Sequence, residues 1–284
     1  MGEQKINMNR MLEHFEQVLK EEEKSNATID KYLRDAARFM GFIGEGSDIT
    51  KDAVIAYKQY LSENYAVTSA NSMLAAVNSF LRAAGREDCA VKFFKVQSTA
   101  FRARDRELTR EEYIRLVEAA KKKGKKCLSL IMQTICATGI RISELRFITV
   151  EALHVRQATV SLKGKTRTVI LPVELCIELK RYIREKKITS GSIFVTRTGK
   201  PIDRSNILHG MKALCEAAKV LKSKVSPHNL RHLFALTYYK VERDICHLAD
   251  LLGHSNINTT RIYTMVSCEE QEQQIDCLGL FIGT

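Results

Sequence analysis

The sequence predicts a mainly α-helical protein of two domains, with a small antiparallel β-sheet in the second domain. Three observations lead to this fold class. Apolar residues recur at helical spacing through residues 7–85, a polar and arginine-containing stretch at 96–106 interrupts them, and the period changes between Thr159 and Pro172. The 284 residues are enough for two ordinary domains.

Four helices are expected in the N-terminal domain, residues 1–95. The first covers Met11 to Leu19, and the second, Ile29 to Met40, follows cap candidates at 25–28. Two more are expected near 51–63, after the cap candidate Thr50, and near 68–84, before Gly85. These helices predict a compact four-helix unit, followed by an interdomain linker at 96–106.

The second domain, residues 107–284, is expected to begin with helices near 110–122 and 126–137. Thr109 and Glu112 have the spacing of a capping box at the start of the first. Two short strands, 159–162 and 167–170, flank a predicted turn at 163–166. Helices resume after Pro172, apart from a loop near 189–191 and a candidate strand at 193–195.

Charge is distributed unevenly along the chain. Residues 1–100 carry 13 Lys and Arg against 14 Asp and Glu, and the remainder carries 32 against 19. The formal net charge of +12 therefore comes from the C-terminal two-thirds. This excess suits a polyanionic partner without identifying one.

Composition also argues against several classes of protein. No apolar run approaches the ~20 residues of a membrane span, and the N-terminus lacks a signal-peptide stretch, so we expect a soluble cytoplasmic protein. The eight cysteines are scattered without a C-x-x-C pair, which indicates reduced thiols and no structural zinc. With no carboxylate cluster suited to Mg²⁺, we expect neither a metal nor a cofactor.

Three segments place charged or titratable residues among apolar neighbours. They are 137–145 with Arg141, 226–232 with His228 and Arg231, and 251–254 followed by Tyr263. Arginine is rarely buried without a partner, so each arginine needs an anion from the protein or from a ligand. Taken singly, each residue has a structural explanation: an Arg141–Glu144 pair, a helix cap at His228, a turn at His254, and a core tyrosine.

Together the three segments resemble the tyrosine recombinase, or phage integrase, family. The pattern consists of an arginine box at 138–145, a hairpin lysine, a His-x-x-Arg box at 228–231, and Leu251-Leu252-Gly253-His254 leading to a tyrosine nine positions later. The resemblance is strong over residues 107–266. It is weaker over the N-terminal helices, as a SAM-like core-binding domain, and it implies that the two domains form a DNA clamp.

The resemblance implies a role for each residue of the pattern. Two planar arginine forks, Arg141 and Arg231, match the oxygens of a phosphodiester, and Tyr263 attacks the phosphorus. His228 is implied to give general acid–base assistance, and His254 a hydrogen bond to the phosphate. Lys163, with Lys165 as the rival, is implied to protonate the leaving 5′-hydroxyl. Glu144 is implied to support the site, and His232 to assist structurally.

Basic residues outside this pattern are candidates for DNA contacts. Lys31, Arg34 and Arg38 lie in the N-terminal domain, and Arg102 and Arg104 lie in the linker. The linker is either a solvated loop or a basic strap along a phosphate backbone.

The resemblance implies site-specific recombination through a covalent 3′-phosphotyrosine, in integration and excision of a mobile element or in Xer-type dimer resolution. The implied partners are double-stranded DNA target sites, further copies in a homotetramer and an accessory protein. The tail at 267–284 packs either on its own domain or on a neighbouring protomer. Two alternatives stay open: relaxation of DNA by a type IB topoisomerase, and DNA binding without catalysis.

Overall fold

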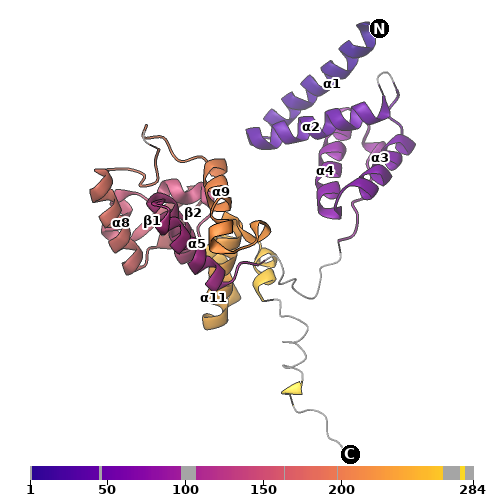
Figure 1. The fold of residues 1–284 in the computed structure, drawn as a ribbon. Helices are drawn as coiled ribbons and strands as arrows, with labels where there is room; N and C mark the ends of the chain where they lie inside the picture. Colours follow the sequence, from indigo (N-terminus) through magenta and orange to yellow (C-terminus); the bar gives the residue numbers. More distant parts are fainter. Residues whose placement is uncertain are drawn as a thin grey trace, which may run out of the picture. The chain divides into compact units, whose positions relative to one another are not determined.

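The computed structural model describes residues 2–44, 47–96, 107–162, 164–196, 198–264 and 276–278, without the side chains of residues 2–8, 162 and 165. The chain divides into two compact units, Met1–Ser98 and Thr99–Thr284 (Figure 1). This division falls inside the predicted linker. Residues 97–106, with Arg102 and Arg104, lie outside the described residues, as does most of the predicted tail at 267–284.

The first unit contains the four predicted helices. They are α1 (Gly2–Glu21), α2 (Asn26–Ile43), α3 (Lys51–Asn64) and α4 (Val67–Ala83), followed by the short 3₁₀ helix η1 (Glu87–Cys89). Thr50 caps α3 as expected, because its side chain accepts a hydrogen bond from the backbone N–H of Ala53. Ser25 stands at the N-cap of α2 but makes no such bond, and its hydroxyl instead pairs with that of Thr28.

Large apolar and aromatic side chains fill the centre of this unit. Phe15, Phe39, Tyr57 and Phe80 are fully buried, and the rings of Phe15 and Phe80 meet edge to face with centroids 5.4 Å apart. Because α1, α2, α3 and α4 all contribute to one cluster, the unit has its own hydrophobic core.

The described part of the second unit consists of helices and one antiparallel β-hairpin. Its elements are α5 (Arg110–Lys122), α6 (Lys126–Thr138), η3 (Ile142–Phe147), α7 (Val150–Val155), β1 (Gln157–Leu162), β2 (Lys165–Ile170), α8 (Val173–Lys186), α9 (Arg204–Lys212), α10 (Cys215–Ala218), η4 (Lys222–Lys224), α11 (Pro227–Glu242), α12 (Ile245–Leu252), η5 (Ile257–Thr259) and η6 (Arg261–Tyr263). The predicted capping box is present, with Thr109 and Glu112 bonding each other's backbone N–H. The predicted fold class, mainly helical with a small antiparallel sheet, is confirmed.

The hairpin is tighter than the sequence predicts. Strands β1 and β2 pair from Gln157–Ile170 to Leu162–Lys165, so Lys165 and Thr166 belong to a strand and the loop has two residues. Gly164 has a φ of +73°, which suits such a short hairpin loop. The expectation of a turn over 163–166 was therefore wrong.

The candidate strand at 193–195 is also wrong. Within that segment only Val195 makes a β-bridge, an isolated one to Pro201, and the preceding residue Ser192 bridges to Thr149. The Val195–Pro201 bridge closes a loop through the bonds from Thr196 N–H to the Lys200 carbonyl and from Ile202 N–H to the Phe194 carbonyl, and it forms no longer ladder.

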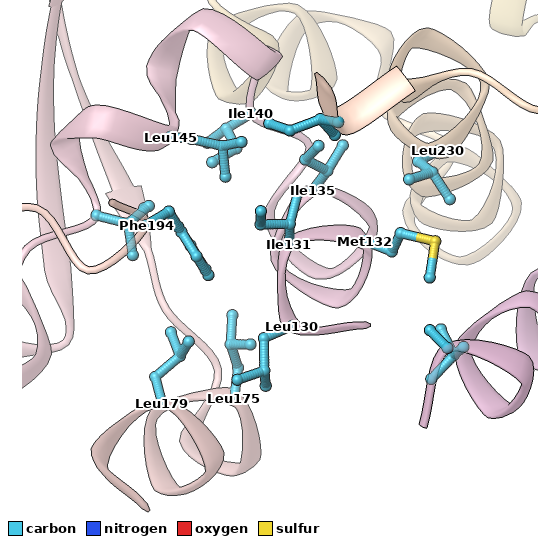
Figure 2. Close-up of a cluster of buried hydrophobic side chains, with 14 of the residues drawn as sticks. Leu130, Ile131, Met132, Ile135, Ile140, Leu145, Leu175, Leu179, Phe194 and Leu230 are labelled. Carbon is cyan, nitrogen blue, oxygen red and sulfur yellow. The ribbon is translucent and has the colours of Figure 1, made fainter. Parts of the chain in front are cut away.

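Helix α6 lies at the centre of the second core. Figure 2 shows Leu130, Ile131, Met132 and Ile135 of α6 among side chains from α8, α11 and the segment after α6. Helix α6 ends at Thr138. Gly139 follows it in the left-handed conformation with a φ of +65°, and this turn directs the chain toward Arg141.

The Gly139 turn gives the first prediction. A Cβ at this position would lie 2.4 Å from the Phe234 ring. We expect Gly139→Ala to lower the free energy of unfolding by about 2–4 kcal/mol, combining the left-handed backbone with the clash.

Urea unfolding measures this change, and Gly124→Ala is the matched control. Gly124 has a φ of +67°, but nothing lies within 4 Å of its added Cβ. The control isolates the backbone cost of about 1–2 kcal/mol. Equal losses in the two variants would contradict the close contact with Phe234.

Candidate active site

Arg141 and Glu144 form the first part of the site, at the start of η3. The backbone N–H of Arg141 donates to Glu144 Oε2 at 2.7 Å, and its Nη1 donates to Oε1 at 3.0 Å. Arg141 Nη2 donates to the carbonyl of Gly253 at 3.2 Å. The Arg141–Glu144 pair that the sequence allows is therefore present. The Arg141 side chain is nevertheless 40% exposed, so it can also meet a ligand.

Arg167 reaches the same carboxylate from β2. Its Nη1 and Nη2 donate to Glu144 Oε1 and Oε2 at 2.9 and 2.8 Å, and its Nε donates to the carbonyl of Leu251 at 3.1 Å. The Glu144 side chain is only 1% exposed. Burial raises the pKa of this carboxyl, but the hydrogen bonds from Arg167 and Arg141 outweigh burial and hold the pKa below its ordinary value. Glu144 is thus a buried anion.

Arg231 of α11 is 3% exposed and has no direct carboxylate partner among its hydrogen bonds. Its Nη1 donates to the carbonyl of Gly139, and its Nη2 donates to the carbonyl of Leu252 at 2.7 Å. Burial, followed by the charge of Arg141, lowers the pKa of Arg231 to about 10. The guanidinium therefore stays charged at neutral pH although it is desolvated.

The hydrogen bonds of His254 fix its tautomer. Its Nε2 lies 3.1 Å from Arg231 Nη2 and its Nδ1 lies 2.8 Å from Thr260 Oγ1. Arginine only donates, so Nε2 accepts and the proton of the neutral ring is on Nδ1. Burial, then the charge of Arg231, lowers the pKa of His254 to about 4. His254 is therefore neutral at pH 7.

Tyr263 lies beside these groups, at the end of η6, and is 4% exposed. Its ring centroid is 6.5 Å from that of His254 and 4.9 Å from that of His232. His232 Nε2 lies 3.2 Å from Glu107 Oε1. The ring of His228 lies 6.4 Å from that of His232, and burial, then the charge of Arg231, lowers the pKa of His228.

The electrostatic balance of this cluster is positive. Arg141 and Arg167 share the carboxylate of Glu144, Arg231 is held by backbone carbonyls, and His254 adds no charge at neutral pH. A second carboxylate, that of Glu107, lies against His232. Arginine forks match the oxygens of a phosphate group. The arrangement can therefore hold a phosphodiester beside the Tyr263 ring.

The structure brings together most of the residues singled out in the sequence. Direct hydrogen bonds join Arg141 to Glu144 and Arg231 to His254, and ring contacts bring in Tyr263, His232 and His228. Lys163 lies outside the described residues. For Lys165 only the backbone is described, paired with Leu162.

The three basic residues of the first unit that were expected to contact DNA lie on one face of α2, at positions 31, 34 and 38. Lys31 Nζ is engaged with Asp35 Oδ2 at 2.7 Å and with the carbonyl of Ser72. Arg34 is exposed, and Arg38, also exposed, lies over the Tyr65 ring.

Arg167 is the site residue that the sequence interpretation missed. Its position in the strand carried a signal, because Arg167, Val169 and Leu171 alternate and therefore share a face. Arg167 pairs with Val160, which is 1% exposed. An arginine on the buried face of a strand needs an anion, and this reasoning would have predicted a partner for it.

No group of three or more His, Cys, Asp or Glu in the described part of the chain could hold a metal ion. None of the described helices is long and apolar enough to cross a membrane.

Comparisons with known proteins agree with the geometry. The phage integrase family matches residues 106–270, and the phage integrase N-terminal SAM-like domain matches residues 12–88. Tyrosine recombinase XerA of Pyrococcus furiosus is 28% identical over 279 residues, 96% of this chain and 95% of the relative. Tyrosine recombinase XerD of Staphylococcus saprophyticus is 31% identical over 269 residues, 86% of this chain and 89% of the relative.

A crystal structure of a lambda integrase tetramer bound to a Holliday junction has the same fold. The TM-score is 0.68 at 19% identity, and the match covers 90% of this chain and 76% of that chain. The chain therefore belongs to the phage integrase family, and as a member of it is a tyrosine site-specific recombinase, an enzyme that breaks and rejoins DNA.

The neutral state of His254 predicts a pH dependence of stability. Between pH 6.5 and about pH 4 the unfolded chain binds a proton at His254 that the folded chain does not. The contribution of His254 to the free energy of unfolding is therefore complete above pH 6.5 and is lost as the pH falls toward 4. We expect wild type to exceed His254→Gln in stability at pH 7, and the difference to shrink by pH 4.5.

Chemical denaturation across this pH range measures the difference. His154→Gln, at an exposed histidine of α7, is the matched control and should follow the wild type. A gap between wild type and His254→Gln that stays constant from pH 7 to pH 4.5 would exclude the lowered pKa of His254.

Proposed function

We propose that Arg141 and Arg231 hold the scissile phosphate while the Tyr263 hydroxyl oxygen attacks its phosphorus. The Tyr263–phosphorus bond forms as the bond to the 5′-oxygen breaks, leaving a 3′-phosphotyrosine and a free 5′-hydroxyl. Attack by a 5′-hydroxyl reverses the step, so the strand is rejoined without ATP. The observation that carries this proposal is the cluster of three guanidiniums beside Tyr263, two of them paired with the buried Glu144 carboxylate and the third, that of Arg231, held by backbone carbonyls.

Two protons move in this reaction. His228 assists removal of the phenolic proton, which is needed because an ordinary tyrosine with a pKa near 10 is a weak nucleophile at pH 7. Lys163, with Lys165 as the rival, gives a proton to the leaving 5′-oxygen. His254 hydrogen-bonds the phosphate, Glu144 supports Arg141, and His232 assists structurally through Glu107.

The N-terminal domain, residues 1–95, contributes DNA affinity, and the two domains with the 96–106 linker clamp the duplex. Arg102 and Arg104 would follow the backbone through the linker. On α2 the charge of Lys31 is offset by the nearly buried Asp35, whereas Arg34 and Arg38 are exposed. The net positive charge of this face therefore comes from the two arginines.

The relatives suggest how the chain assembles. One structural relative is described as a tetramer bound to a Holliday junction. We extend this to a homotetramer that exchanges strands between two target sites, with the tail at 267–284 joining protomers and an accessory protein setting direction. Because the substrate is chromosomal or mobile-element DNA, we place the activity in the cytoplasm.

Covalent trapping tests the nucleophile. The protein is mixed with nicked duplexes drawn from the DNA that flanks its gene, so that the cleaved fragment diffuses away and the adduct persists. We expect an SDS-resistant protein–DNA adduct with wild type and none with Tyr263→Phe, because phenylalanine has no hydroxyl to form the bond.

Tyr239→Phe is the control, since Tyr239 packs against the same cluster as Tyr263. An adduct that persists in Tyr263→Phe would reassign the nucleophile, and binding without any adduct would favour a non-catalytic DNA-binding protein. Relaxation of a plasmid that lacks the trapped site would instead favour a type IB topoisomerase.

The face of α2 gives a separate prediction. We expect Arg34→Gln with Arg38→Gln to weaken DNA binding and to reduce the slope of log affinity against log salt by about 2, one for each phosphate that is no longer neutralised. Gel-shift titrations at several salt concentrations measure the slope. Lys20→Gln, at an exposed residue of α1 paired with Glu16, is the control, and an unchanged slope in the arginine variant would remove α2 from the DNA interface.

A further inference from the structure

Arg167 is fixed at three places within the site. Its guanidinium spans both oxygens of Glu144, and its Nε donates to the carbonyl of Leu251, the next-to-last residue of α12. Its Cδ lies against Gly253, where an added Cβ would come within 2.8 Å of it. With 14% exposure, the side chain is held between η3 and the turn that carries His254.

Glu144 has two arginines for its one negative charge. A carboxylate that is 1% exposed needs its charge compensated. Arg167 does so with a two-pronged contact, the strongest geometry for this pair. Arg141 makes one side-chain bond to Glu144 and turns its other terminal nitrogen to Gly253, while staying 40% exposed. The buried Arg167 therefore compensates the charge of the Glu144 carboxylate, and the guanidinium of Arg141 stays available to a ligand.

We propose that Arg167 is a positioning residue that occupies the Glu144 carboxylate so that Arg141 stays available to the scissile phosphate. Without the Arg167 fork, Glu144 would draw Arg141 into a two-pronged pair. The phosphate would then compete with a buried carboxylate for the same guanidinium. This inference rests on the proposed role of Arg141 in holding the phosphate.

The first test is Arg167→Met, which keeps an unbranched chain and removes the fork. We expect the rate of adduct formation at saturating protein to fall by about tenfold or more, a typical loss when a residue supporting a site is removed. DNA affinity should change by less than about twofold, because a buried side chain makes no contact with the duplex. Arg181→Met, at an exposed arginine paired with Glu178, is the matched control and should behave as wild type.

A second substitution separates positioning from loss of folding. Glutamine at position 144 carries no charge to capture Arg141, so Arg167→Met with Glu144→Gln should form adduct faster than Arg167→Met alone. Thermal melting confirms that each variant is folded at the assay temperature. A double variant no faster than Arg167→Met would overturn the inference.

The dependence on pH gives an independent readout. Burial raises the pKa of Glu144 and the hydrogen bonds from Arg167 lower it, so removing the Arg167 fork should raise this pKa. Acid that protonates the carboxylate would free Arg141, so the rate of Arg167→Met relative to wild type should rise as the pH is lowered. The double variant should show no such rise. A ratio for Arg167→Met that falls as the pH is lowered would overturn the inference.

The two proposals fail separately. If wild type forms no adduct that depends on Tyr263, the proposed function fails. If wild type forms that adduct and Arg167→Met matches its rate, only the role of Arg167 fails.

Discussion

The buried carboxylate of Glu144 is the interaction on which the site depends. It accepts hydrogen bonds from the backbone and side chain of Arg141 and from both terminal nitrogens of Arg167. These arginines continue to the carbonyls of Gly253 and Leu251, so one carboxylate ties together η3, β2 and the end of α12. Removing one partner of a buried ion pair lowers the free energy of unfolding by about 3–5 kcal/mol, which is a large part of a typical domain's stability. The three segments are distant in sequence, yet they are held as one unit.

Arg231 shows how the protein keeps a buried charge available. Its acceptors are the carbonyls of Gly139, directly after α6, and Leu252, the last residue of α12. Carbonyl groups at helix C-termini carry partial negative charge, which stabilises a cation without neutralising it. A carboxylate in the same place would offset desolvation better, but it would also compete with a phosphate. The site keeps a net positive charge because carbonyls, and not a carboxylate, accept the hydrogen bonds of Arg231.

Local patterns in the sequence predict the helices well, whereas long-range pairing is where the prediction fails. The capping box at Thr109 and Glu112 needs only three residues of context, and it is present. The hairpin shows a local failure as well: the composition of segment 163–166 does not distinguish a two-residue loop from a four-residue one, and so Lys165 was placed in a turn although it pairs with Leu162. Arg141 and Arg231 were recognised as arginines in need of an anion, but the contact between Arg167 and Glu144 spans 23 residues, and no local motif marks it. The assignment of Tyr263 came from the resemblance, since a buried tyrosine alone is ordinary.

The tautomer of His254 constrains how it can meet a phosphate. Its Nε2 accepts from Arg231 and its Nδ1 proton faces Thr260, so a neutral ring in this state has no donor to offer from Nε2. A hydrogen bond from Nε2 to a phosphate oxygen therefore requires a second proton on the ring. Burial and the charge of Arg231 oppose that proton and lower the pKa to about 4. A phosphate oxygen brings negative charge to the same place and favours the protonated ring. Protonation of His254 and binding of the phosphate are thus coupled, because each lowers the cost of the other.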